Sequence, residues 1–297
     1  MKYNYLFFAL FILLFSFQLS AQEDDLLSLL GEEEEVTNYA TAAFKTNRVI
    51  NLHSIESTAK GVLDVKISHR FGFINTGIYE LFGLDNASIR IGADYGITNR
   101  LTVGLGRSSF EKTYDGFLKF KFLKQSSGKK NMPVTAAAFA SMAIKTQRWE
   151  NPDRENYFSS KLYYSYQVII GRKFSKSFSF QLSPSLVHRN LVKTKAERND
   201  VFALAAATRI KLTNRLALNL EYVYVFPDQL APEFQNSFSV GFDIETGGHV
   251  FQLHFTNSTS MIEKGFITET VGKWSNGDIH FGFNVSRVFT VVKPKIK

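Results

Sequence analysis

The chain of 297 residues contains no cysteine, which excludes disulfides, thiolate metal sites and cysteine nucleophiles. It also lacks any run of about 18 apolar residues, the length that a transmembrane helix requires, so a helical membrane protein is not expected. Its 35 basic and 27 acidic residues are dispersed, and no basic helix interleaved with aromatics predicts a nucleic-acid partner. The net charge of +8 instead favours a solvated surface, or one that faces lipid headgroups or anions.

Catalytic arrangements are missing as well. Small outer-membrane phospholipases place a serine two residues after a histidine on the lipid face, next to its base. Four histidines, His69, His188, His254 and His280, are followed at that spacing by Phe71, Asn190, Thr256 and Gly282. No glycine-rich phosphate loop occurs, because Gly104 and Gly106 lie inside a segment with the alternation of a strand. The sequence therefore predicts no enzyme, no catalytic residue and no cofactor.

The N-terminus has the pattern of a secretory signal peptide. Residues 6–17 are apolar or small, Lys2 precedes them, and Leu19-Ser20-Ala21 follows as a cleavage site. We predict that residues 1–21 are a signal peptide cleaved before Gln22, the alternative being a buried N-terminal helix. Residues 22–60 are predicted to be an acidic and polar periplasmic segment. Within it, residues 22–35 would be a flexible tail or a short amphipathic helix that docks on a periplasmic partner or at the barrel mouth, and residues 36–60 could lie inside the lumen as a plug.

From Gly61 to the C-terminus, twelve segments alternate residue by residue between apolar and polar side chains, as strands with one wet face do. Tight turns follow the second, fourth, sixth, eighth and tenth segments, while the opposite connections are longer. This asymmetry is typical of outer-membrane barrels, whereas a β-sandwich needs Greek-key crossovers. We predict an all-β fold, a closed antiparallel up-and-down transmembrane β-barrel of about 12 strands over residues 61–297. Pro184 predicts a bulge or a strand end, because proline cannot donate to a ladder.

Lipid does not solvate charge, so the apolar face of each strand is expected outside and the polar face inside. By parity the inner face carries ten basic and five acidic residues. The lumen-lining candidates are Lys66, Arg70, Arg90, Asp94, Lys119, Lys121, Arg209, Lys211, Glu221 and Asp243. The excess of bases would favour anions in an open lumen. Alternatively, acids and bases on adjacent strands pair and fill a narrow barrel.

Histidine offers a further candidate on the same inner face. His254 and His280 lie on consecutive predicted strands at like parity, and Asp278 lies two residues from His280. Two histidines and a carboxylate could bind a divalent metal. The plainer interpretation is that both histidines form hydrogen bonds in a wet wall, and no metal site is predicted.

Several short stretches resemble an uncharacterised family of β-barrel proteins, a domain of unknown function widespread in Bacteroidota. They lie between about Phe44 and Phe289, and are residues 69–72 (HRFG), 98–101 (TNRL), 245–249 (ETGGH), 254–257 (HFTN) and 277–283 (GDIHFGF). No single stretch is diagnostic, whereas their order is fairly specific. The resemblance implies an outer-membrane location and brings no known activity or site residue.

Two functions follow from these observations. The first is a passive channel or small-solute pore that leans toward anions, with lysine and arginine as the filter. The second is a non-conducting scaffold or interaction barrel, whose acidic segment or long loops bind a partner. In both cases we expect the barrel to contact outer-membrane lipids. Only the channel would also bind a small anionic solute.

Overall fold

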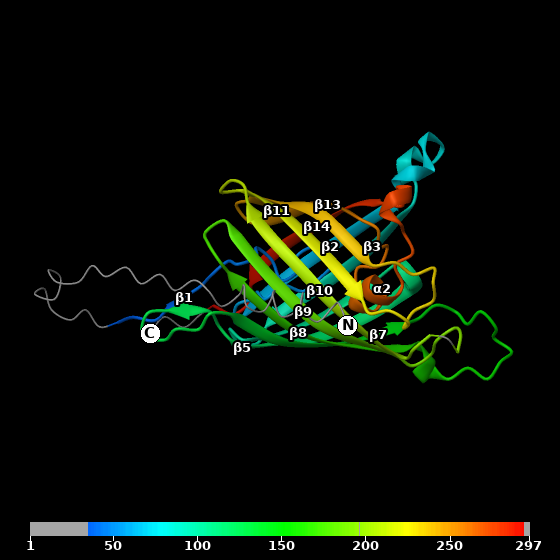
Figure 1. Cartoon of the computed structure of the whole chain (residues 1–297), viewed down its shortest axis with the longest axis horizontal. Coiled ribbons are helices and arrows are strands. Elements are labelled where there is room, and N and C mark those ends of the chain that lie inside the picture. Colours follow the sequence, from blue (N-terminus) through cyan, green and yellow to red (C-terminus); the bar gives the residue numbers. More distant parts are fainter. Residues whose placement is uncertain (1–34, 196, 294–297) are drawn as a thin grey trace, which may run out of the picture. The chain divides into compact units, whose positions relative to one another are not determined.

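Twelve antiparallel strands close into a barrel in the computed structural model, which describes residues 35–195 and 197–293. Each barrel strand pairs with the barrel strands before and after it, and β14 pairs with β2 to close the ring (Figure 1). The predicted closed twelve-stranded antiparallel barrel is thereby confirmed. The barrel strands are β2 (Val62–Phe73), β3 (Ala87–Gly96), β4 (Leu101–Ser108), β5 (Thr113–Leu123), β7 (Thr135–Lys145), β8 (Leu162–Lys173), β9 (Phe178–Arg189), β10 (Asp200–Lys211), β11 (Leu216–Val225), β12 (Ser237–Thr246), β13 (His249–Thr256) and β14 (His280–Thr290).

Other regular structure is sparse. Strands β1 (Asn38–Tyr39) and β6 (Ser126–Ser127) pair with each other in a separate two-stranded sheet. Helix α2 (Glu263–Thr268) is the one α-helix among the described residues. The 3-10 helices are η2 (Ile74–Thr76), η3 (Ile78–Gly83), η4 (Phe110–Lys112), η5 (Phe158–Lys161) and η6 (Trp274–Asn276). None of the helices in the described part of the chain is long and apolar enough to cross a membrane.

Successive side chains of each barrel strand point alternately to an outer, apolar face and to an inner face. On β5, Leu118 and Phe120 are 56% and 47% exposed, whereas Lys119 between them is 0% exposed. Successive side chains of a strand point to opposite faces, so the period of two in the sequence becomes an inside and an outside. Closure pairs every strand on both edges, so the backbone N–H and C=O groups of the wall find partners within the sheet, as a barrel in lipid requires.

Two connections differ from the predicted alternation of short turns and long loops. The link from β5 to β7, predicted as a tight turn, covers residues 124–134 and contains β6. The link from β4 to β5, predicted as long, covers only residues 109–112. The first is extended because β6 reaches out to pair with β1. We name the two barrel ends the short-turn end, where β8 turns into β9, and the long-loop end, where β13 leads to β14.

Pro184 causes neither a bulge nor a strand end, and that prediction is wrong. Strand β9 continues through Pro184, and its pairing with β8 passes from Gln167↔Ser185 to Ile170↔Leu182 without a change of register. The two residue pairs between these points are missing from the ladder. Proline removes a donor while its fixed φ suits an extended strand, so the defect is local.

Two segments fill the interior of the barrel. Residues 43–58, here called the N-terminal plug, are buried or partly buried throughout. Residues 257–270, here called the inner loop, include α2 and are equally enclosed. Figure 1 shows α2 at one end of the barrel and β1 at the other. The inner loop thus enters from the long-loop end, and the plug reaches the lumen from the short-turn end.

The plug leaves the lumen beside β3, where a glycine is required. The backbone N–H of Gly61 donates to the carbonyl of Gly96 at 2.8 Å. A Cβ at Gly96 would lie 2.0 Å from the carbonyl oxygen of Ala59. Only glycine allows the chain to approach the wall this closely.

Candidate functional site

The N-terminal plug is anchored by one carboxylate of the wall. Glu221, on β11, accepts hydrogen bonds from the backbone N–H groups of Ile50, Asn51 and Leu52 at 3.1, 2.9 and 3.1 Å. The plug turns at this point, since the N–H of Val49 donates to the carbonyl of Leu52 at 2.8 Å. Hydrogen bonds to an ionised acceptor are stronger than neutral ones, so Glu221 is a strong attachment.

Two basic residues of the wall hold the plug through neutral groups. The ammonium of Lys119 donates to the carbonyls of Asn47 and Ser54 at 3.4 and 3.1 Å. The guanidinium of Arg70 donates to the side-chain oxygen of Asn51 at 2.7 Å. Neither cation lies in a salt bridge with a carboxylate of the described residues. The plug supplies both acceptors of Lys119, whereas Arg70 also donates to the carbonyl of His69 and the side-chain oxygen of Asn284 on the wall.

Wall amides complete the polar attachment. Gln252 donates to the carbonyl of Val49 at 2.6 Å, and Asn284 donates to the carbonyl of Ile50 at 3.1 Å. Gln181 donates to the carbonyl of His53 at 2.8 Å and accepts the N–H of Ile55 at 3.1 Å. The irregular backbone of the plug therefore finds its partners on the barrel wall, as buried backbone must.

Part of the lumen wall between β5 and β11 is apolar, although the sequence predicts a polar inner face. Phe44, Val49, Leu52 and Ile55 of the plug belong to one buried cluster with wall residues and with α2. The wall and α2 members are Phe117, Phe139, Ile169, Val187, Val201, Ala203, Ala205, Ala207, Val223, Phe266 and Ile267. Apolar residues at inward parity from Val201 to Ala207 are the signal that sequence reasoning missed. A water-filled lumen does not favour such a run, whereas a packed plug does.

The inner loop meets the plug in the middle of the barrel. Arg48 of the plug forms a salt bridge with Glu263 of α2 at 3.2 Å and donates to the carbonyl of Met261 at 3.4 Å. The ring of His53 lies 3.7 Å from the same carboxylate and packs at 4.4 Å against the rings of Phe117 and Phe139. The two fillers therefore support each other as well as the wall.

A charged cluster fastens the inner loop at the long-loop end. Lys264 forms salt bridges with Glu111 and, at 2.7 Å, with Glu269, and Lys145 contacts Glu111 at 2.7 Å. Lys264 also lies 4.3 Å from the ring centre of Tyr163. Burial disfavours the charged form of Glu111, but Lys264 and Lys145 outweigh it and hold the pKa of Glu111 below its ordinary value of 4.5.

The predicted excess of basic charge in the lumen is largely balanced. Arg90 forms a bidentate pair with Asp115, an inward acid that the sequence analysis left out. Three more of the basic candidates form pairs, namely Lys66 with Asp64 and Asp94 at 3.3 Å each, Arg209 with Asp243 at 3.7 Å, and Lys121 with Glu56 at 3.9 Å. Lys211 is partly buried on β10. Acids of the wall and Glu56 of the plug thus pair with four of the seven basic candidates.

The two histidines and Asp278 do not come together as a metal site. The ring of His280 lies 2.7 Å from the carbonyl of Phe71 and 2.9 Å from the hydroxyl of Thr259. Asp278 accepts a hydrogen bond from Asn75 at 2.6 Å. His254 is buried, with no hydrogen-bond partner among the described residues. Residues 35–195 and 197–293 contain no group of three or more histidine, aspartate or glutamate side chains able to hold a metal.

A cavity of about 530 Å³ remains at the short-turn end, between the plug and the walls of β12, β13, β14 and β2. Lys45 and Glu245 form a salt bridge of 2.5 Å at this cavity, and Asp64 lies on its wall side. The side chains of Lys45 and Glu245 are 30% and 38% exposed, so this side of the plug faces solvent.

Two porins, an outer membrane channel and one family model are similar to this chain. The NanC porin aligns with a TM-score of 0.49 and 8% identity over 76% of this chain and 98% of its own. The KdgM porin aligns at 0.46 and 8% over 77% and 99%, and an outer membrane channel from Pseudomonas putida F1 at 0.44 and 14% over 79% and 98%. No curated protein matches the sequence. Residues 44–289 match the model of the family described as "Membrane bound beta barrel domain (DUF5777)".

Proposed function

The chain belongs to this DUF5777 family of membrane-bound β-barrels, and from that premise we propose that it is an outer-membrane channel for small solutes, held closed by its own N-terminal plug. The observation that carries the proposal is the polar attachment of the plug. Glu221, Lys119 and Arg70 bind it through hydrogen bonds that water can replace. A barrel interior that served stability alone would be better filled by apolar residues.

The location is part of the proposal. Apolar outer faces on all strands suit lipid, and an apolar leader followed by Leu19-Ser20-Ala21 suits export. The leader and residues 22–34 lie outside the described residues. We propose that the membrane is a bacterial outer membrane, that the source is a member of the Bacteroidota, and that the mature chain begins at Gln22. N-terminal sequencing of the purified protein tests the start of the mature chain.

The proposed channel prefers anions when the plug has left the lumen, which we call the open state. In the closed state Lys119 and Arg70 donate to carbonyl and amide oxygens of the plug. When the plug leaves, these two charges face the lumen without a carboxylate in salt-bridge contact among the described residues. Rings of basic side chains select anions in pores, so the solute is proposed to be a small anion.

The non-conducting scaffold stays as the second candidate because of the apolar cluster. Phe44, Leu52 and Ile55 of the plug pack against the wall of β7 to β11, and their burial opposes release. In that case the sheet of β1 and β6 would present the N-terminal segment to a periplasmic partner.

Conductance in planar bilayers separates the two candidates. The full chain is expected to be mostly closed, and a variant without the plug anchor, Glu221→Ala, is expected to show frequent, anion-preferring steps. The Asp64→Asn variant is the matched control, because Asp64 contacts Lys66 and Ser286 of the wall. Silence of the anchor variant at high protein load, when hydrogen exchange shows that its plug is released, would exclude the channel and favour the scaffold. Steady conductance of the unmodified chain would show that the plug does not close it.

A further inference from the structure

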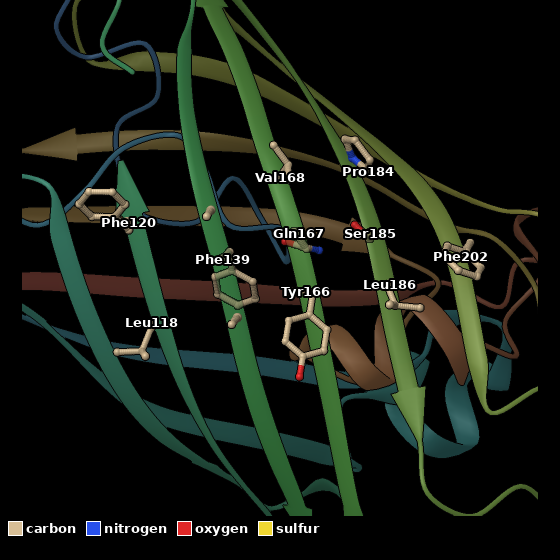
Figure 2. Close-up of a pocket in the computed structure, with 12 residues that line it drawn as sticks. Leu118, Phe120, Phe139, Tyr166, Gln167, Val168, Pro184, Ser185, Leu186 and Phe202 are labelled. Atoms are coloured by element: carbon tan, nitrogen blue, oxygen red, sulfur yellow. The ribbon is translucent and has the colours of Figure 1, made fainter. Parts of the chain in front are cut away.

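A row of inward-facing side chains crosses the lumen wall at one level. Lys119 of β5 lies opposite Phe139 of β7, which lies opposite Gln167 of β8. Gln167 in turn lies opposite Ser185 of β9, and all four residues are at most 6% exposed. In Figure 2 Phe139, Gln167 and Ser185 lie on three neighbouring strands. Residues that face each other across a ladder share one face of the sheet, so a cation, an aromatic ring and an amide meet on the inner face.

The N-terminal plug covers this row with a ring and a carbonyl oxygen. The ring of His53 packs at 4.4 Å against the rings of Phe139 and of Phe117, which precedes Lys119 on the inner face of β5. Neither ring nitrogen of His53 has a hydrogen-bond partner in the part of the chain that the structure describes, so the two phenylalanines do not require a polar ring. The carbonyl oxygen of the next residue, Ser54, accepts from the ammonium of Lys119 at 3.1 Å. The plug therefore presents an aromatic ring with an acceptor beside it.

Departure of the plug would leave the polar groups of this row without partners. Both acceptors of Lys119 are carbonyls of the plug. Lys121, the next inward residue of β5, would lose its salt-bridge partner Glu56 at the same time. The amide of Gln167 is unpaired already, since neither its nitrogen nor its oxygen has a hydrogen-bond partner among the described residues. A ligand that brings an anion to the lysines and a hydrogen bond to the amide can therefore take the place of the plug.

We propose that this row binds a small aromatic carboxylate with a hydroxyl group opposite the carboxylate. The carboxylate replaces the carbonyl of Ser54 on Lys119, and the aromatic ring replaces the ring of His53 between the two phenylalanines. The hydroxyl meets the amide of Gln167, which can both donate and accept. The backbones of β5 and β8 lie on either side of β7, about 10 Å apart, which suits one ring with a polar group at each end. This site rests on the proposed release of the plug, and it names the class of anion that the channel would carry.

Hydrogen exchange on the purified full-length protein in micelles tests the site without relying on conduction. A ligand that binds only the plug-released state raises the population of that state, so the plug amides must exchange faster. The probe is para-hydroxybenzoate, for which we expect a dissociation constant of about 1 mM from its size. At about 10 mM it should accelerate exchange of the Leu52 and Ile55 amides roughly tenfold, while the strand amides keep their protection. Unchanged exchange of the plug amides at about 50 mM would overturn the proposal.

Two related acids test the parts of the ligand separately. Benzoate lacks the hydroxyl, so it should bind about fivefold more weakly than para-hydroxybenzoate. Cyclohexanecarboxylate has the charge of benzoate and nearly its size but no aromatic ring, so it should bind about threefold more weakly than benzoate. Equal responses to the three acids would show an effect of any organic anion and would overturn the aromatic site.

Three wall variants and one control locate the site, each measured as the ratio of exchange rates with and without para-hydroxybenzoate. Lys119→Met removes the ammonium and should reduce the ratio to about twofold or less. Phe139→Leu removes one ring and should lower the ratio about threefold. The control Phe120→Leu makes the same change on the outer face of β5 and should leave the ratio unchanged.

Gln167→Leu is the most specific of these variants. Gln167 has no hydrogen bond to the plug, so exchange without ligand should stay the same. The variant should respond equally to para-hydroxybenzoate and benzoate, because the amide that distinguishes them is absent. The strand amides report in the same experiment whether each variant is folded. A full response in the folded Gln167→Leu or Lys119→Met variant would overturn the assignment.

Chloride conductance of Glu221→Ala separates failure of the site from failure of the channel. If this variant conducts while the plug amides of the unmodified protein do not respond to para-hydroxybenzoate, the channel stands and the site is overturned. If the variant is silent while the plug amides respond, the site is supported and the channel is overturned.

Discussion

Replacement of Glu221 by alanine should release the N-terminal plug. The carboxylate accepts three backbone N–H groups, from Ile50, Asn51 and Leu52. Each buried donor that loses its partner costs about 1–3 kcal/mol. Water can enter the space that alanine leaves and can bind these N–H groups. Removal of the carboxylate also removes the cost of burying its charge. We therefore expect the bound state of the plug to lose about 3 kcal/mol in total. This corresponds to a shift of about a hundredfold toward the released plug.

Amide hydrogen exchange on the full-length protein in micelles measures this shift directly. The amides of Ile50, Asn51 and Leu52 should exchange about a hundredfold faster in Glu221→Ala, while the amides of the barrel strands keep their protection. Glu221→Gln retains one acceptor oxygen and should accelerate exchange by only about tenfold. Asp64→Asn changes a lumen carboxylate bonded to wall residues and should leave the plug amides unchanged.

One result would refute the reasoning. If the plug amides of Glu221→Ala kept the protection of the unmodified protein, the carboxylate would not anchor the plug. The apolar cluster around Phe44 and Leu52 would then be the dominant attachment. If the strand amides lost protection to the same extent, Glu221 would stabilise the barrel rather than the plug.

Three further predictions concern other charged contacts. Arg90→Met leaves Asp115 buried without its partner and should lower the free energy of unfolding by about 3–5 kcal/mol, whereas adding Asp115→Asn should restore most of it, as denaturant titration in detergent would show. Because the pKa of Glu111 is lowered in the folded protein, its salt bridge stabilises the inner loop at neutral pH and is lost as the pH falls below about 4.5. The protection of the α2 amides, measured relative to the intrinsic exchange rate at each pH, should therefore fall in acid, and less so in Lys264→Met. In a plug-released background, Lys119→Met should reduce the ratio of anion to cation permeability by roughly twofold.

Each of these predictions has a clear opposite outcome. A double variant as unstable as Arg90→Met alone would show that the pair with Asp115 is not the source of the loss. An unchanged acid response in Lys264→Met would assign the response to another group. An equal permeability ratio with and without Lys119 would remove this residue from the filter.

The alternation along each strand was readable from the sequence because it depends on neighbouring residues only. Leu118, Lys119 and Phe120 are placed outside, inside and outside by the period of two, whatever the rest of the chain does. The barrel and its strand number followed, since twelve such segments must pair on both edges. Two connections, residues 109–112 and 124–134, differ in length class from the prediction. Their length depends on the distance that the chain must span between its neighbours, which composition does not show.

The filled lumen was decided by tertiary structure alone. Glu221 and Asn51 are 170 positions apart, and Arg48 and Glu263 are 215 positions apart, so no local pattern links them. The sequence left a plug, a tail and a docking helix open for residues 22–60, because burial of a polar segment requires partners from the whole ring. By itself the sequence determined the alternation of inward and outward side chains along each strand. Only the closed barrel decided what those side chains hold, since their partners come together when β14 meets β2.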